Sequence, residues 1–250
     1  METKIRQITE KLFSMSAKTP FHYLRILSLF TAISIILFFN EVYGESKEVL
    51  YVPIGDSYTI GEGASLEESW PALLTFHLRA KGIPIKILAN PARTGWTTAH
   101  AIQYALPVYK SLKPTFATLL IGVNDWVQGA DAETFRKHLR FLLDNMLTVL
   151  PQKDHLLIIT IPDFSVTPAG ANFSDGRNIS EGIAQFNSII VEEAHKRDLP
   201  VVDIYPISQK MKEDSSLIAA DRLHPSAKEY AVWEEMIFKE AFRILSRNTP

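Results

Sequence analysis

Short apolar runs alternate along this chain with longer stretches whose apolar residues recur at helical spacing. The apolar runs are residues 49–54, 84–89, 116–121, 155–161 and 200–204. The stretches with helical spacing are residues 69–81, 97–106, 131–150, 180–197 and 226–245. Strands that alternate with helices indicate a parallel sheet with helices on both faces. The alternation therefore predicts one α/β domain, a three-layer α/β/α sandwich around a five-stranded parallel sheet.

Residues that favour helix ends mark several of these boundaries. Asp131 is suited to cap the helix that follows it, and Pro151 is expected to stop that helix. Gly82 ends the stretch that begins at residue 69. We also expect Pro107 to break the helix of residues 97–106, because proline lacks the amide hydrogen that a helix interior uses.

Composition excludes several classes of function. The chain has 250 residues, 46% hydrophobic and 22% charged, which suits one globular domain with a full core. Its formal net charge of −2 lacks the positive excess of nucleic-acid-binding proteins, so no nucleic-acid partner is expected. The sequence contains no cysteine, which excludes disulfides, thiol catalysis and cysteine-ligated metal sites.

The first 44 residues differ from the rest. A net-positive lead precedes the uncharged run 26–39, and residues 42–44 offer a cleavage region. Such a run is typical of a signal peptide and is shorter than the roughly 20 residues of a membrane span. We expect residues 1–44 to be a signal peptide or an uncleaved anchor that meets the membrane through residues 21–39. Residues 45–250 would then lie outside the cytoplasm, in the periplasm, secreted or held at the membrane.

A third interpretation of the same segment is a buried helix that packs on the domain. The position of the run before the first strand and its uniform apolarity argue against a buried helix.

Glycine and polar residues directly follow four of the predicted strands. These segments are residues 55–57, 90–95 and 122–125 and the loop of residues 162–179. Because open α/β sheets bind ligands beyond the carboxyl ends of their strands, the four segments should meet at one edge of the sheet. The loop 162–179 is rich in proline, glycine and asparagine, and would form a mobile wall or lid there.

A serine and a histidine in these positions suit nucleophilic catalysis. Ser57 lies in the glycine turn after the first strand, and Asp221 stands three residues before His224 in a turn stopped by Pro225. A serine hydroxyl is a weak nucleophile unless an adjacent base takes its proton, and a third group improves the base by orienting it. Of the seven histidines, only His224 has a carboxylate three residues before it in a turn.

The same edge offers hydrogen-bond donors for a developing oxyanion. The backbone N–H groups of Ser57 and Gly95 and the side-chain amide of Asn124 could form such a hole. Glycine suits this role because no Cβ keeps the backbone away from a ligand. Trp96 and Trp126 each follow one of these motifs directly; they either line a substrate pocket or pack under helices.

Each motif by itself also has a purely structural explanation. Gly-Asp-Ser can be only a turn, Gly95 a turn that enters a helix, and Asn124-Asp125 a helix cap. The argument for catalysis rests on the order of the motifs and on their shared position at strand ends.

Together these blocks resemble the GDSL-type, or SGNH, hydrolase superfamily of esterases and lipases, from about residue 49 to residue 233. Its four blocks are named for Ser, Gly, Asn and His, matched here by Ser57, Gly95, Asn124 and His224, with Asp221 as the carboxylate of the triad. The resemblance implies a flavodoxin-like sheet of order 2-1-3-4-5 and a shallow site for varied esters. Segments 56–63 and 92–98 look like a bacterial subgroup of GDSL esterases.

The first block departs from the usual Gly-Asp-Ser-Leu, because Tyr58 stands in the place of the leucine. We expect His224 to take the proton of Ser57, which attacks an ester, while Asp221 orients the imidazole. In many members of the superfamily a backbone carbonyl supplements or replaces that carboxylate. The substrate would be a lipid, lysophospholipid or short-chain ester such as an acetyl ester, with no cofactor and no metal.

Two other classes of function compete with this interpretation. A metal-dependent phosphoesterase could use Asp56, Asp125, Asp221 and His224. Two-metal sites need several carboxylates or histidines that converge, and no second histidine accompanies His224 at this edge. A catalytically silent module that binds glycans at the cell surface is the second alternative. The presence of every triad and oxyanion residue argues against the silent module.

Overall fold

The predicted strands form one parallel sheet in the order β2-β1-β3-β4-β5, in a computed structural model that describes residues 48–248. Neighbouring strands β1 and β3 are in register from Tyr51 opposite Phe116 to Gly55 opposite Leu120, so they end level with each other. This order and direction confirm the predicted flavodoxin-like arrangement. The strands are β1 (Val49–Gly55), β2 (Ile85–Ile87), β3 (Phe116–Leu120), β4 (Leu156–Ile159) and β5 (Val201–Val202).

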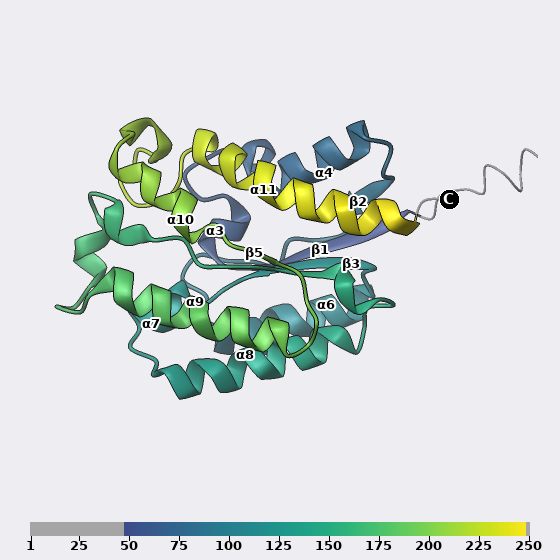
Figure 1. Cartoon of the computed structure of the whole chain (residues 1–250), viewed down its shortest axis with the longest axis horizontal. Helices are drawn as coiled ribbons and strands as arrows, with labels where there is room; N and C mark the ends of the chain where they lie inside the picture. Colours follow the sequence, from purple (N-terminus) through teal and green to yellow (C-terminus); the bar gives the residue numbers. More distant parts are fainter. Residues whose placement is uncertain (1–47, 249–250) are drawn as a thin grey trace, which may run out of the picture. The chain divides into compact units, whose positions relative to one another are not determined.

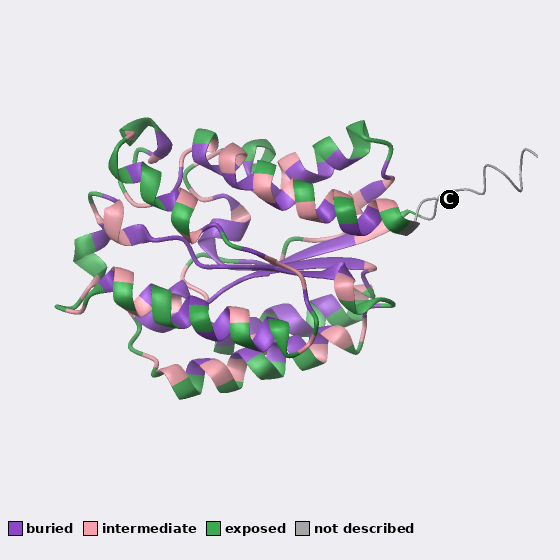
Figure 2. Cartoon of the chain, viewed as in Figure 1, coloured by how far each residue is buried: buried purple, intermediate pink, exposed green. Residues whose placement is uncertain are grey.

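Helices cover both faces of the sheet, which confirms the three predicted layers (Figure 1). On one face, α4 (Trp70–Ala80) packs beside α11 (Ala227–Leu245). The other face carries α6 (Leu106–Leu112), α8 (Ala132–Leu147) and α9 (Ile179–His195). Every residue of β3 and β4 is buried between these layers, as expected for strands with continuous apolar sequences (Figure 2).

The predicted cap of the long helix is confirmed. Asp131 accepts a hydrogen bond of 2.7 Å from the N–H of Thr134, and α8 begins at the next residue, Ala132. A side-chain acceptor at this position satisfies one of the amides that the first helical turn leaves unpaired. Asn178 caps α9 in the same way by accepting from the N–H of Glu181.

The expectation that Pro107 breaks a helix is wrong. The chain stays helical from α5 (Thr98–His100) through a π-helical turn, η2 (Ala101–Ala105), into α6. In that turn the N–H of Leu106 bonds to the carbonyl of Ala101, five residues earlier. Pro107 lies in the first turn of α6, directly after this wider turn, which accommodates the proline within a continuous helical segment.

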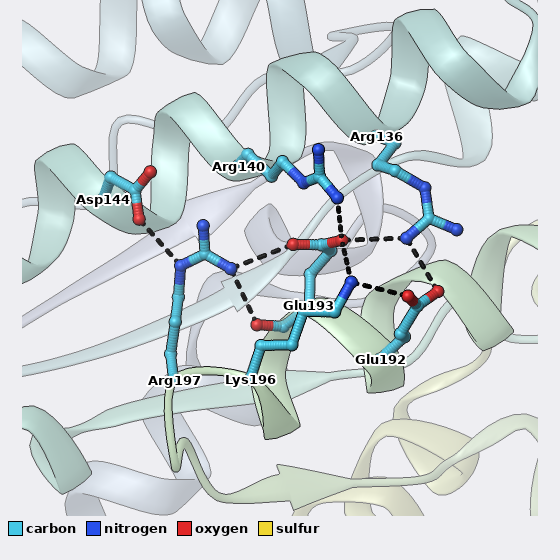
Figure 3. A network of polar contacts seen from close by, with 7 residues as sticks. All are labelled: Arg136, Arg140, Asp144, Glu192, Glu193, Lys196 and Arg197. Atoms are coloured by element: carbon cyan, nitrogen blue, oxygen red, sulfur yellow. Dashed lines mark hydrogen bonds and ion pairs between the residues drawn. The ribbon is translucent and has the colours of Figure 1, made fainter.

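A charged network joins α8 to α9 around Glu193, whose side chain is only 1% exposed (Figure 3). Its Oε1 accepts hydrogen bonds from the guanidinium groups of Arg136 and Arg140 of α8, at 2.8 and 2.9 Å. Lys196 and Arg197 reach it at 3.2 and 3.0 Å. The four cations offset the cost of burying this carboxylate, and they clamp together two helices of the same layer.

Short helices follow the strands at the edge that the sequence indicated. α3 (Ser57–Ile60) comes directly after β1, and α7 (Val123–Val127) follows β3 after two residues. Loop 162–179 contains two 3₁₀ turns, η4 (Phe164–Val166) and η5 (Gly170–Phe173). The remaining short helices are α10 (Tyr205–Ser208), η1 (Leu66–Glu68), η3 (Lys153–His155), η6 (Gln209–Lys212), η7 (Ser215–Leu217) and η8 (Ser246–Asn248).

The predicted signal peptide or anchor, residues 1–44, lies outside the described residues. Within residues 48–248, the helices are too short or too polar to cross a membrane.

Candidate active site

Ser57 is the first residue of α3, at the carboxyl end of β1. The preceding Asp56 caps this short helix, because its Oδ1 accepts the N–H of Tyr58 at 3.1 Å. The turn requires glycine at position 55, since a Cβ there would lie 2.0 Å from Oγ1 of Thr59. The sequence Gly-Asp-Ser therefore places the serine at the edge of the sheet by a turn that a larger residue could not make.

A hydrogen bond of 2.6 Å joins Oδ2 of Asp221 to Nδ1 of His224. The other carboxylate oxygen accepts the backbone N–H groups of Leu223 and His224, both at 2.9 Å. Partial burial acts to raise the pKa of Asp221, but these hydrogen bonds outweigh it and hold the pKa below its usual value. The ionised carboxylate keeps the proton of His224 on Nδ1, which leaves Nε2 to accept one.

Ser57, Asn124 and His224 line one cavity of about 80 Å³. The structure thus brings together residues from α3, from α7 and from the turn before α11. The rest of the wall is largely apolar and includes two aromatic residues of loop 162–179; it consists of Tyr58, Val123, Val127, Phe164, Phe173 and Leu223. The loop forms a wall of the cavity, as its position in the sequence indicated.

Gly95 does not line this cavity. Its φ of +78° lies in the left-handed region that favours glycine, and its carbonyl accepts Gln128 at 3.3 Å. The amide of Asn124 donates to the carbonyl of Trp96 at 3.0 Å. That contact ties the loop of Gly95 to α7 and uses only one of the two amide hydrogens of Asn124.

Neither predicted tryptophan lines the cavity of Ser57. Trp126 is 5% exposed, its ring packs edge-on against Phe164, and the guanidinium of Arg177 lies 4.0 Å above it. Trp126 therefore packs inside the protein, which is the second of the two roles expected from the sequence. Trp96 stacks on Tyr104 and lines a second, larger cavity.

Tyr58, the departure from the usual first block, packs against the histidine. Its ring meets His224 edge-on at a centroid distance of 5.9 Å and meets Trp233 in the same way at 5.8 Å. Burial raises the pKa of its hydroxyl far above the ordinary value, so the ring is neutral. Tyr58 thereby supports the imidazole from the side with apolar surface.

The sequence argument missed Glu62. Its Oε2 lies 3.9 Å from Nε2 of His224 and accepts a hydrogen bond from the hydroxyl of Thr94. The signal available in the sequence was an acidic residue between Gly61 and Gly63, directly after the serine turn. Glu62 brings a second carboxylate to the side of the imidazole that must exchange protons.

Within the described residues, Asp56 and Asp125 do not join Asp221 and His224 in a possible metal site. Within residues 48–248, the group whose ligand atoms lie within 4.8 Å of one another is Glu62, Asp221 and His224. Burial raises the pKa of Asp56 to about 8, which favours its neutral form. The carboxylate of Asp125 accepts hydrogen bonds from the N–H and from the hydroxyl of Thr98.

A parallel sheet of this order with a Gly-Asp-Ser turn at its edge defines an SGNH-type hydrolase. The chain belongs to the GDSL-like Lipase/Acylhydrolase family, which it matches over residues 54–232. Membership makes the protein a carboxylic ester hydrolase of the GDSL type.

Solved structures with the same fold include several bacterial esterases. The family 3 carbohydrate esterase of Clostridium thermocellum is 20% identical, with a TM-score of 0.66 over 82% of this chain and 100% of that one. The lipase/acylhydrolase of Enterococcus faecalis is 21% identical, with a TM-score of 0.63 over 80% and 96%. Esterase EstA of Pseudoalteromonas sp. is 18% identical, with a TM-score of 0.61 over 79% and 98%. The curated proteins contain no sequence that matches this chain.

Proposed function

We propose that this protein is a serine esterase that hydrolyses short-chain carboxylic esters through an acyl-enzyme on Ser57. The observation that supports this most directly is the 2.6 Å hydrogen bond between Asp221 and His224, on a histidine that shares a cavity with Ser57. A carboxylate-bound imidazole beside a serine hydroxyl is the arrangement that activates a serine nucleophile.

In this mechanism Nε2 of His224 takes the proton of Ser57 as the serine oxygen attacks the ester carbonyl. The resulting oxyanion is held by the N–H of Ser57 and by the amide of Asn124, which both line the cavity, and loss of one such donor typically costs about 10²–10³ in turnover. The imidazolium then protonates the leaving alcohol. Water, deprotonated by the same histidine, releases the acid from Ser57.

The size of the cavity favours a short acyl group. Its volume is about 80 Å³. Phe164 and Phe173 line it, and an acetyl or propionyl group fits within this volume. One structural neighbour is named an acetyl xylan esterase, which is consistent with a short acyl group.

The test is turnover of p-nitrophenyl esters from acetyl to palmitoyl by the full chain. We expect the highest kcat/KM for acetyl or propionyl and a loss of at least about 10³-fold in Ser57→Ala. Ser188→Ala, a serine exposed on α9, is the matched control and should keep full activity. Inactivity on every ester, with Ser57 also unlabelled by a serine-reactive phosphonate, would overturn the proposal in favour of a silent binding module.

A further inference from the structure

A second cavity, of about 530 Å³, is lined by loop 89–96 and by the helical segment that follows it. Asn90, Arg93 and Trp96 contribute from the loop, and Tyr104 and Val108 from η2 and α6. The catalytic steps proposed above do not use this cavity. It is several times larger than the cavity of Ser57, so it has room for a group much larger than the acyl part of a short ester.

Two of its lining residues, Trp96 and Tyr104, belong to a stack of rings that is partly open to solvent. Trp96 stacks on Tyr104 at a centroid distance of 5.7 Å, and Tyr104 stacks in turn on His100 at 6.3 Å. Tyr104 is 49% exposed and Val108 39%, although residues of this size normally bury most of their surface. Exposed apolar surface in a concave place marks a binding site, and the polarised C–H bonds of a sugar ring pack well on an aromatic face.

The rim of the cavity supplies donors for hydroxyl groups. Arg93 is exposed there and presents a planar guanidinium with five N–H donors. Asn90 shapes the loop instead, because its amide donates to the carbonyl of Thr59 and its oxygen accepts the N–H of Ala92. An aromatic stack with a polar rim suits a ring that has apolar faces and hydroxylated edges, which is the chemistry of a carbohydrate.

The same loop leads from this cavity to the catalytic histidine. Between Arg93 and Trp96 stands Thr94, whose hydroxyl donates to Glu62. Oε2 of Glu62 lies 3.9 Å from Nε2 of His224, the atom that hands a proton to the departing alcohol. A ligand held by this loop would therefore lie on the side of the imidazole that faces the departing alcohol.

We propose that the Trp96–Tyr104 cavity binds a carbohydrate, and that this carbohydrate is the alcohol half of the substrate. The sugar ring packs on Trp96 and Tyr104, and its hydroxyls bond to Arg93. The second part of this proposal rests on the proposed esterase function, whereas binding of a sugar to the cavity does not.

Binding is tested by calorimetric titration of full-length Ser57→Ala with xylotriose, cellotriose and tri-N-acetylchitotriose. We expect saturable binding of at least one of them, weakened at least tenfold by Tyr104→Ala and by Arg93→Gln, both changes of exposed side chains. Phe141→Ala removes an equally exposed aromatic ring from α8 and should leave binding unchanged. Absence of binding to all three sugars would overturn the proposal. So would binding that is as tight in the Tyr104→Ala and Arg93→Gln variants as in Ser57→Ala alone.

The role as the alcohol half is tested by kinetics with the serine in place. Tyr104→Ala should raise KM for the acetylated form of the bound trisaccharide at least tenfold, with kcat/KM for methyl acetate changed less than twofold. An equal effect on both esters would overturn this role. Sugar binding by Ser57→Ala together with no ester hydrolysis by the unmodified chain would instead overturn the proposed function and leave the carbohydrate site standing.

Discussion

At the scale of single residues, Asp221 has the most tightly determined role. One of its carboxylate oxygens holds the backbone of the histidine turn and the other holds the imidazole. The residue that shapes the turn is thus also the one that sets the tautomer of His224. A change at this position should be visible in catalysis beyond its effect on folding.

Asp221→Asn is predicted to lower kcat for p-nitrophenyl acetate by roughly 10³–10⁴-fold with little change in KM, because the amide no longer stabilises the imidazolium or enforces the productive tautomer. Asp214→Asn is the matched control. Asp214 makes a similar turn by accepting the N–H of Ser216 at 2.9 Å, but it bonds to Lys228 and to no histidine. Comparable losses of kcat in the two variants would contradict the assigned role of Asp221.

Gly63 is predicted to be required for the position of the histidine. Its φ is +96°, and a Cβ would lie 2.6 Å from Cβ of Ala219 and 2.7 Å from the carbonyl of Pro225. Gly63→Ala should therefore displace the turn of His224 and reduce kcat/KM at least tenfold, with a loss of unfolding free energy measured in urea. Gly82→Ala has a similar φ of +84° with nothing within 4 Å, so it should show backbone strain of about 1–2 kcal/mol and full activity.

At the scale of elements, the local sequence pattern was sufficient to predict the strands and most of the helices. Their apolar runs and caps are local features, and the strand order followed from the family resemblance. The error at Pro107 arose because a π turn directly before the proline lets the helix continue past it. The positions of Glu62 and Trp126 depend on how separate segments fold together, which no local pattern contains.

The clamp between α8 and α9 leads to a prediction about stability and pH. Burial acts to raise the pKa of Glu193, but hydrogen bonds from Arg140, Arg136, Arg197 and Lys196 outweigh it and lower the pKa strongly. Glu193→Gln should lower the unfolding free energy at pH 7 by about 1–3 kcal/mol, a value reduced because the cations are partly exposed. Urea unfolding of both proteins measures this difference.

A lowered pKa in the folded state means that this stabilisation is fully present above the unfolded pKa of about 4.5 and is lost as the pH falls below it. The difference between the unmodified protein and Glu193→Gln should therefore shrink between pH 5 and pH 3. Glu192→Gln is the control, because Glu192 is 47% exposed and should contribute less than about 1 kcal/mol. Equal effects of the two substitutions at pH 7 would show that burial of Glu193 does not strengthen the clamp.

At the scale of the whole molecule, the described residues contain a complete core and the residues proposed for catalysis. The five strands and the helices on both faces lie within residues 48–248, as do Ser57, Asp221 and His224. A chain that begins at Glu45 should therefore fold and hydrolyse p-nitrophenyl acetate with the kcat of the full chain. Circular dichroism and turnover test this prediction, and a shortened chain that fails to fold would contradict it.

On this prediction the apolar run of residues 26–39 is not needed to form the catalytic domain, and we propose that it directs export. In a bacterial host the full chain with a C-terminal tag should be found in the periplasm or at the outer face of the inner membrane, where protease added to spheroplasts digests it. The chain of residues 45–250 should stay in the cytoplasm and resist the protease. A full chain that remained protected from the protease would contradict export, provided that added protease digests a known periplasmic protein in the same spheroplasts.

The N-terminal sequence of the exported protein distinguishes cleavage of the segment from anchoring. It would begin near residue 45 after cleavage, and an anchored form would retain residues 21–39.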